Sequence, residues 1–386
     1  MSTTIDLDAI VEELGPDFAA RAGELDRTDS FATENYDALR GRMVFSALAP
    51  TELGGGGASH SQMCDFVRRL AHHCGSTALA VSMHQHLVAA AVANDRAGRP
   101  GRKLITKVAD GKTVLVSTGA NDWLESNGSA ERVDGGFLVS AVKPFASGSP
   151  AGDVLVTSAA FDDPSDGPQV IHFPLSLRSE GVSFAGDWET LGMRATGSQT
   201  IKLERVFVSD DSVALRRSRT GFHPAFSVIL TVAMPLIMSA YVGIAEKAAD
   251  LARGRAAGRG GDPITPYLVG EMENLLATAQ IARDDMVRLA NDLEFEPTPG
   301  LASKILVRKT ICAKHVIATV EKALEVCGGG GFFRKFGLER LLRDVHASQF
   351  HPLPEKRQQV FTGRLAIGLD PVNFAAELQP RVATAA

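Results

Sequence analysis

The spacing of apolar residues changes twice along the chain. From residue 5 to about 109, apolar side chains recur at helical spacing, as in CDFVRRLAHHC and ALAVSMHQHLVAAAVA. From 112 to about 208, short runs with a strong preference for strands, such as KTVLVS, GFLVSAVKPF and TIKLERVFV, are separated by clusters of Gly, Asp and Pro. From about 224 onward, long stretches with helical spacing return. The sequence therefore predicts helices, then strands, then helices.

These three blocks predict a mostly helical α+β protein. We expect an N-terminal α-helical domain over 1–111, a compact antiparallel β domain over 112–210 and a C-terminal four-helix bundle over 211–386. The most apolar stretch, 225–245, is interrupted by Pro235, serines and a threonine, whereas a membrane helix needs roughly 20 uninterrupted apolar residues. This stretch is therefore predicted to be a buried core helix.

Net charge and cysteine content limit which binding partners and which cellular compartment we expect for this protein. A formal net charge of −5 argues against general nucleic-acid binding, which needs a positive surface to displace counterions. The acidic N-terminus lacks the basic region and apolar run of a secretory signal. None of the cysteines forms a C-x-x-C pair, so free thiols in a reducing compartment are expected. We expect a cytoplasmic protein that binds neither nucleic acid nor membrane, and no metal.

Two glycine runs, at 54–57 and 328–331, do not fit a nicotinamide site. The dinucleotide fingerprint G-x-G-x-x-G lies between a strand and a helix, and its last position here would be Ser59 or Phe333. Taken alone, such runs are ordinary turns in which the backbone needs positive φ.

Five sequence motifs occur in an order that is informative as a whole. They are PTELGGGG at 50–57, KPFASG at 143–148, LGMRATGSQTIKLERVFV at 191–208, CGGGGF at 327–332 and LERLLRD at 338–344. In this order, and with the helix, strand, helix layout, the chain resembles the acyl-CoA dehydrogenase superfamily over nearly its whole length. Each motif is weak alone, but the series is hard to obtain by chance.

The resemblance implies a flavin, usually FAD, held between the β domain and the C-terminal bundle. It places Phe145 beside the isoalloxazine ring, Ser147 and Ser149 at the ring edge, and Thr196 and Ser198 at further flavin contacts. Hydroxyl groups suit a ring that accepts negative charge on reduction. Without the resemblance, these would be ordinary polar groups on strands.

The resemblance also implies a homo-oligomer, most simply a tetramer, with flavin sites shared between chains. Arg259 corresponds to an arginine that grips the pyrophosphate of a flavin bound by a neighbouring subunit, although Arg255 in the same glycine-rich segment is an equal candidate. Gly328 and Gly329 fall in the glycine run that, by the resemblance, lies beside the adenylate part of FAD. Glu325 stands where the family often has glutamine, which puts that contact in doubt.

The carboxylate base of an acyl-CoA dehydrogenase is missing from both of the places where the family puts it. Eight residues after Asp344 the chain has Pro352, and ten residues before Gly243 it has Ala233. Neither side chain can remove the α-proton of a thioester. Glu355 is close in sequence and is a candidate if the prolines redirect the loop.

Histidines are the other candidate catalytic groups. His351 is placed like the histidine of dibenzothiophene-type flavin monooxygenases, which share this fold and lack the glutamate. A histidine there can hold or shuttle a proton near neutral pH, although a structural role at a helix end is the ordinary alternative. His84 and His86 point about 200° apart on a helix, so at most one faces the site, and His84 is named as the candidate.

Three functions remain open at this point. The whole-chain resemblance implies an FAD-dependent oxidoreductase acting on the CH–CH group of an acyl-CoA thioester, with an electron-transfer flavoprotein as its partner. The missing glutamate and His351 favour a two-component monooxygenase that uses O2 and reduced flavin, FMN included, from a flavin reductase. A catalytically silent homologue that binds CoA esters or flavin is the third, and the retained flavin contacts argue against it.

Overall fold

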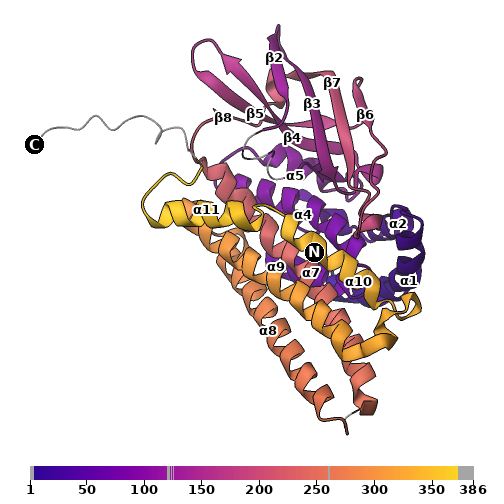
Figure 1. The fold of residues 1–386 in the computed structure, drawn as a ribbon. Helices are drawn as coiled ribbons and strands as arrows, with labels where there is room; N and C mark the ends of the chain where they lie inside the picture. Colours follow the sequence, from indigo (N-terminus) through magenta and orange to yellow (C-terminus); the bar gives the residue numbers. More distant parts are fainter. Residues whose placement is uncertain (1–3, 120–121, 123, 125, 260, 373–386) are drawn as a thin grey trace, which may run out of the picture.

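The structure is a computed structural model that describes residues 4–119, 122, 124, 126–259 and 261–372. The sheet stands at one end of a body of helices (Figure 1). The first helices are α1 Leu7–Arg27, α2 Thr33–Gly41, α3 His60–Ala71, α4 Gly75–Arg96 and α5 Arg102–Val108. The mostly helical α+β fold predicted from the sequence is confirmed.

The start of α3 shows how local sequence sets a boundary. The Ser59 hydroxyl accepts a hydrogen bond from the Gln62 backbone N–H at 3.1 Å, and the Gln62 side chain accepts one from the Ser59 N–H at 2.8 Å. This reciprocal capping box satisfies backbone donors that a helix N-terminus otherwise leaves unpaired. The helix therefore begins at His60, three residues after the end of the glycine run at 54–57.

The strands form one sheet of eight strands. They are β1 Leu115–Ser117, β2 Ser129–Val133, β3 Gly136–Ala146, β4 Val154–Asp163, β5 Gly167–Ser176, β6 Val182–Phe184, β7 Gln199–Ser209 and β8 Leu215–Ser218. The order is β6-β7-β3-β2-β4-β5-β8, with β1 beside β4. Most pairs are antiparallel as predicted, but β1 and β2 run parallel to β4. Because β8 pairs with β5, the sheet continues past residue 210, where the β domain was predicted to end.

The C-terminal helices pack as long antiparallel rods with shorter helices against them. They are α7 Pro224–Ala256, α8 Ile264–Ala290, α9 Pro299–Cys327, α10 Leu338–Val345 and α11 Glu355–Ala366. The segment 224–259 is long and apolar enough to cross a membrane by composition, but its most apolar window is entirely buried inside the protein. The predicted core helix at 225–245 is therefore confirmed.

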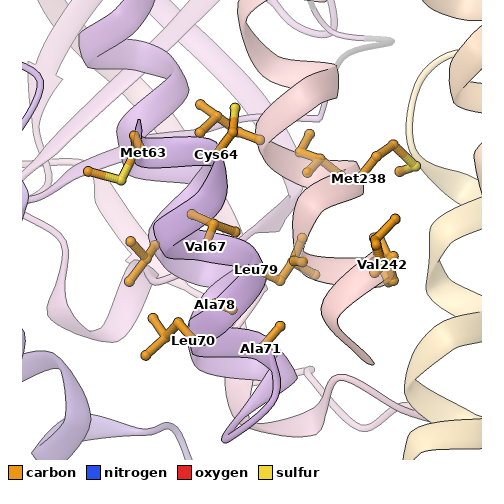
Figure 2. Packing of buried hydrophobic residues seen from close by; sticks show 14 of the residues in the cluster. Met63, Cys64, Val67, Leu70, Ala71, Ala78, Leu79, Met238 and Val242 are labelled. Atoms are coloured by element: carbon orange, nitrogen blue, oxygen red, sulfur yellow. The ribbon is translucent and has the colours of Figure 1, made fainter. Parts of the chain in front are cut away.

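Helices α3, α4 and α7 meet in the main hydrophobic core. Figure 2 shows Val67 and Ala71 of α3 beside Leu79 of α4 and Met238 and Val242 of α7. A Cβ atom on Gly243 would lie 2.1 Å from the Arg68 carbonyl oxygen, so α7 approaches α3 this closely only because that residue is glycine. Close packing here fixes the axial position of α7, which carries part of the cavity described below.

Acid should destabilise the fold between about pH 6.5 and pH 4. Burial lowers the pKa of five histidines to between about 3 and about 4; they are His60, His84, His86, His172 and His351. A base with a lowered pKa in the folded state stabilises the fold above its unfolded pKa, and this stability is lost as pH falls. Burial raises the pKa of Asp344 to about 6, so this carboxyl group is protonated in the folded state at pH 5 and releases its proton on unfolding. This release offsets one of the protons that the histidines take up.

At pH 5, unfolding should therefore take up about four protons net, and the melting temperature should fall steeply from pH 7 to pH 4.5. Calorimetry across this range checks the expectation. A melting temperature that is level between pH 7 and pH 4.5 would contradict the assignment of these histidines as neutral in the fold.

Candidate functional site

A cavity of about 970 Å³ lies between the sheet and the helices. One wall is apolar and comes from α4 and α7. Its residues are Leu79, Met83, Ile229, Leu230, Ala233, Met234 and Ile237. The rest of the lining comes mainly from residues 117–119, 122, 126 and 127, from β3, from the segment before β7 and from the segment 346–352, and it carries most of the polar groups. A cavity of this size and composition is that of a small-molecule site.

The hydroxyls that the resemblance assigned to the flavin are brought together in the cavity wall. The Ser198 Oγ lies 2.7 Å from the Ser147 Oγ and 2.6 Å from the Thr196 Oγ1, and all three residues are buried and line the cavity. Ser149 does not line it: its hydroxyl donates to the Gly197 carbonyl at 3.0 Å. Ser149 therefore holds the turn that carries Ser198.

Phe145 lines the cavity beside these hydroxyls. Its side chain is 63% exposed, its backbone φ is +60°, and its ring meets the Trp188 ring edge-on at 6.0 Å between centroids. Backbone with positive φ is uncommon for an aromatic residue, and such strained conformations concentrate at ligand sites. An aromatic face next to three clustered hydroxyls fits a planar ring that needs hydrogen bonds at its edge, so the residues present fit a flavin.

Asp344 anchors the segment that carries Thr196 and Ser198. Its Oδ1 accepts a hydrogen bond from the Met193 backbone N–H at 2.5 Å. A Cβ atom on Gly192 would lie 2.5 Å from the carbonyl of Arg343, so the segment approaches α10 closely only because that residue is glycine. Two of the sequence motifs, at 191–208 and 338–344, are thus joined in space at the cavity.

A buried ion pair forms part of the polar side. The Lys143 ammonium lies 2.5 Å from the Asp122 carboxylate and also donates to the Ser158 carbonyl at 2.7 Å and to the Asn127 carbonyl. The Thr118 hydroxyl donates to the same carboxylate at 2.6 Å. Burial lowers the pKa of Lys143 while the Asp122 charge opposes that shift. Both partners are saturated, so the pair fixes the cavity wall.

His351 and Tyr241 form a hydrogen-bonded pair inside the cavity. The Tyr241 hydroxyl lies 2.7 Å from the His351 Nε2, and both residues line the cavity. His351 is half-buried and lines the cavity. Burial, with smaller contributions from Lys309 and His86, lowers the pKa of His351 to about 3, and burial raises the pKa of Tyr241. At neutral pH the pair is therefore an uncharged imidazole and an uncharged phenol.

His86 lines the cavity in place of His84. The His84 Nδ1 accepts from the Leu115 N–H at 2.8 Å and its Nε2 donates to the Phe45 carbonyl at 2.7 Å. Both of its nitrogens join α4 to neighbouring segments, and His84 is not among the cavity residues, so its assignment as a catalytic candidate is withdrawn. The His86 Nδ1 lies 3.3 Å from the Ser82 carbonyl, which puts the proton on Nδ1 and leaves Nε2 as an acceptor.

The two positions where the family carries its base both face the cavity. Ala233 and Pro352 line it, and neither has a carboxylate. Glu355 does not line it: its carboxylate lies 2.5 Å from the Lys314 ammonium, which lowers the pKa of Glu355. Within the part of the chain that the structure describes, Asp122 is the only carboxylate in the cavity lining, and Lys143 holds it.

The residues that the resemblance assigned to the adenylate lie away from this cavity. Arg259 follows Tyr241 by eighteen residues, about 27 Å along α7 and its 3₁₀ extension at 1.5 Å per residue. Its guanidinium donates to the Val326 carbonyl at 2.9 Å, and Glu325 pairs with Lys322 at 2.6 Å. Gly328 and Gly329 begin the 3₁₀ turn Gly328–Phe332 that follows α9. None of these four residues lines the cavity.

The fold and the cavity are those of a flavin-dependent oxidoreductase. Residues 8–112 match the family described as acyl-CoA dehydrogenase, N-terminal domain, and residues 236–355 match acyl-CoA dehydrogenase, C-terminal domain. The chain therefore belongs to the acyl-CoA dehydrogenase superfamily of flavoproteins, as its motifs predicted.

Similar proteins span nearly the whole chain. The L-evernosamine nitrososynthase of a Micromonospora strain is 28% identical, and the match covers 93% of this chain and 89% of that protein. The dibenzothiophene monooxygenase of Rhodococcus erythropolis is 26% identical, with 89% of each chain covered. The solved structure of KijD3 with FMN and a dTDP-linked amino keto sugar superimposes with a TM-score of 0.85 at 26% identity, covering 95% of both chains.

Proposed function

We propose that the protein is a two-component monooxygenase, which uses O2 and reduced flavin from a partner reductase to oxygenate a small organic molecule. The observation that carries this proposal is the lining of the cavity. The positions that would hold a dehydrogenase base are Ala233 and Pro352, and the neutral pair His351–Tyr241 lies in the same cavity. The named relatives, a nitrososynthase and a dibenzothiophene monooxygenase, support it.

The overall reaction balances without a carboxylate base. Reduced flavin supplies two electrons and two protons, one oxygen atom of O2 enters the substrate, and the other leaves as water. His351 and Tyr241 hold a proton beside the reaction centre, because each is neutral and can donate or accept through the 2.7 Å hydrogen bond. The apolar wall of α4 and α7 excludes water, which limits proton leakage and side reactions.

The same wall supports a compact, mainly apolar substrate. Few groups in the cavity can make polar contacts with a substrate, and His86 Nε2 is an acceptor among them on the apolar side. The apolar side chains of this wall include Leu79, Met83, Ile229, Met234 and Ile237. Such a site orients an apolar molecule by shape and by few hydrogen bonds. Few of the described residues that line the cavity have cationic side chains. One of them, Arg343, already pairs with Asp26 at 2.6 Å.

FMN is the flavin that we propose, with FAD as the alternative. Phe145, Ser147, Thr196 and Ser198 serve the ring in either case. The adenylate of FAD would need Arg259 and the Gly328 turn of a second copy, and Glu325 replaces the amide expected there. The KijD3 structure with FMN supports this choice.

A homo-oligomer in the cytoplasm stays part of the proposal. The family resemblance supports the homo-oligomer, and the four free, buried cysteines fit a reducing compartment.

Acyl-CoA dehydrogenation is the second candidate, favoured by the family to which the chain belongs. Anaerobic titration separates the two functions. The protein with bound oxidised flavin should keep its absorbance when short-chain and long-chain acyl-CoA thioesters are added. Among the described residues, the one carboxylate that lines the cavity belongs to Asp122, and its ion pair with Lys143 keeps it from removing the α-proton. Bleaching by any thioester in the absence of oxygen would refute the proposed function, and failure to take up either flavin would favour the silent homologue.

A further inference from the structure

The segment 346–354 presents His351 to the cavity without regular secondary structure of its own beyond one 3₁₀ turn. Five of its residues line the cavity: His346, Ala347, Phe350, His351 and Pro352. The turn His346–Phe350 ends directly before His351, so its last carbonyls need donors from elsewhere. What fixes these carbonyls also fixes the position of the His351 ring.

Lys309 of α9 supplies those donors from behind the segment. It is 1% exposed, and its ammonium donates to the Leu353 carbonyl at 3.2 Å and to the Gln349 carbonyl at 3.5 Å. These carbonyls lie two residues after and two residues before His351. Lys309 therefore joins both sides of the histidine to one rigid helix, and it does not itself line the cavity.

The charge of Lys309 is unusual for its surroundings. The hydrogen bonds that it makes among the described residues go to neutral carbonyl oxygens. Burial lowers the pKa of Lys309 to about 8, with Cys312 and Glu355 opposing that shift, so the ammonium form still predominates at neutral pH. A buried lysine without a hydrogen-bonded carboxylate costs stability that an apolar side chain would not. Its positive charge lies near His351 and favours the neutral imidazole.

We propose that Lys309 is a positioning residue for His351, which holds the Gln349 and Leu353 carbonyls on either side of the histidine and keeps a positive charge behind its ring. The role in oxygenation rests on the proposed function, whereas the role in holding the segment does not. Lys309 touches neither the cavity nor a substrate, so its effect must pass through His351.

Hydrogen exchange tests the holding role without any substrate. Lys309→Met keeps the chain length but removes the charge and all donors, and Lys304→Met makes the same change at an exposed position of the same helix. Mass spectrometry should show exchange in peptides covering 346–354 about tenfold faster in Lys309→Met, the value of one lost hydrogen bond, and unchanged in Lys304→Met. Unchanged exchange in Lys309→Met would overturn the proposal. If Lys309→Met does not fold, Lys309→Gln takes its place in the test. Because it keeps a neutral donor, exchange in peptides covering 346–354 should be faster than in the parent protein, but by less than about tenfold.

A double-mutant comparison tests the role in oxygenation. Lys309→Met should lower product formation by about 10- to 100-fold and raise hydrogen peroxide, because a small displacement of a proton-handling group has such an effect, while FMN binding stays within a factor of about three. In a His351→Ala background the same change should lower the remaining rate less than about twofold. A full 10- to 100-fold loss in that background would mean that Lys309 acts independently of His351. If the parent protein oxygenates no probe, the proposed function fails and the exchange result alone decides the holding role.

Discussion

Replacement of His351 by alanine should lower substrate oxygenation by about 10²–10⁴-fold, the usual contribution of a positioned acid or base. FMN uptake should be unchanged, because the groups that we propose as flavin contacts, Phe145, Ser147 and Thr196, lie on other segments of the cavity. Hydrogen peroxide should rise in proportion to the lost product, since oxygen that is reduced without proton control leaves as peroxide. Oxygen consumption, product and peroxide measured together check this result.

Two further variants make the His351 test specific. Tyr241→Phe removes the 2.7 Å partner of His351 and should lower product formation by a smaller factor than His351→Ala. Glu355→Gln should have little effect, because the carboxylate pairs with Lys314 outside the cavity lining. Loss of activity in Glu355→Gln with normal activity in His351→Ala would show that our assignment of the proton-handling group is wrong.

Lys143→Met should destabilise the protein by about 3–5 kcal/mol, the cost of leaving one partner of a buried ion pair uncompensated. The Lys143 side chain is fully buried and that of Asp122 is 7% exposed, so the Asp122 carboxylate would keep little contact with water after loss of the ammonium. The segment 126–127 and strand β4 would lose a shared donor at the same time. Urea denaturation followed by circular dichroism measures the change.

The double variant Lys143→Met with Asp122→Asn should recover much of this loss, because it removes the unpaired charge. Lys202→Met is the matched control: Lys202 is exposed on the neighbouring strand β7, and its change should stay within about 0.5 kcal/mol. A Lys143→Met protein within about 1 kcal/mol of the parent would contradict a saturated buried pair at the cavity wall.

The order of helices and strands could be predicted from the sequence because apolar spacing is a local property. The pairing of the strands could not, because the parallel contacts of β1 and β2 with β4 join segments that local patterns do not relate. For the same reason the sequence placed the end of the β domain before β8, whose pairing with β5 lies outside the range of any local motif.

The candidate site was located by motif order, but individual side chains depended on helix phase. His84 and His86 lie on opposite faces of α4, and the choice between them required the position of β1 and of the Phe45 carbonyl. Tyr241 was missed although a signal existed. It lies eight residues after Ala233 on the same helical face, and both line the cavity.

Glu355 and Lys309 show two limits of sequence reasoning at this site. The proximity of Glu355 to His351 in sequence suggested a shared cavity, but α11 begins at Glu355 and directs it toward Lys314. Lys309 lies 40 and 44 residues before the two carbonyls that it contacts, so only the packing of α9 against that segment brings them together. Long-range contacts of this kind carry no local sequence signal.

Isotope incorporation tests the oxygenase assignment most directly. The purified protein receives FMN reduced by a separate flavin reductase under ¹⁸O2, together with an aromatic sulfide, indole, an aromatic amine and an amino-sugar nucleotide as separate probes. Mass spectrometry should find one ¹⁸O atom in the product of at least one apolar probe, and about 10²–10⁴-fold less of that product when His351→Ala replaces the parent at equal flavin occupancy. The absence of ¹⁸O from every product, with all consumed oxygen recovered as hydrogen peroxide, would contradict the account.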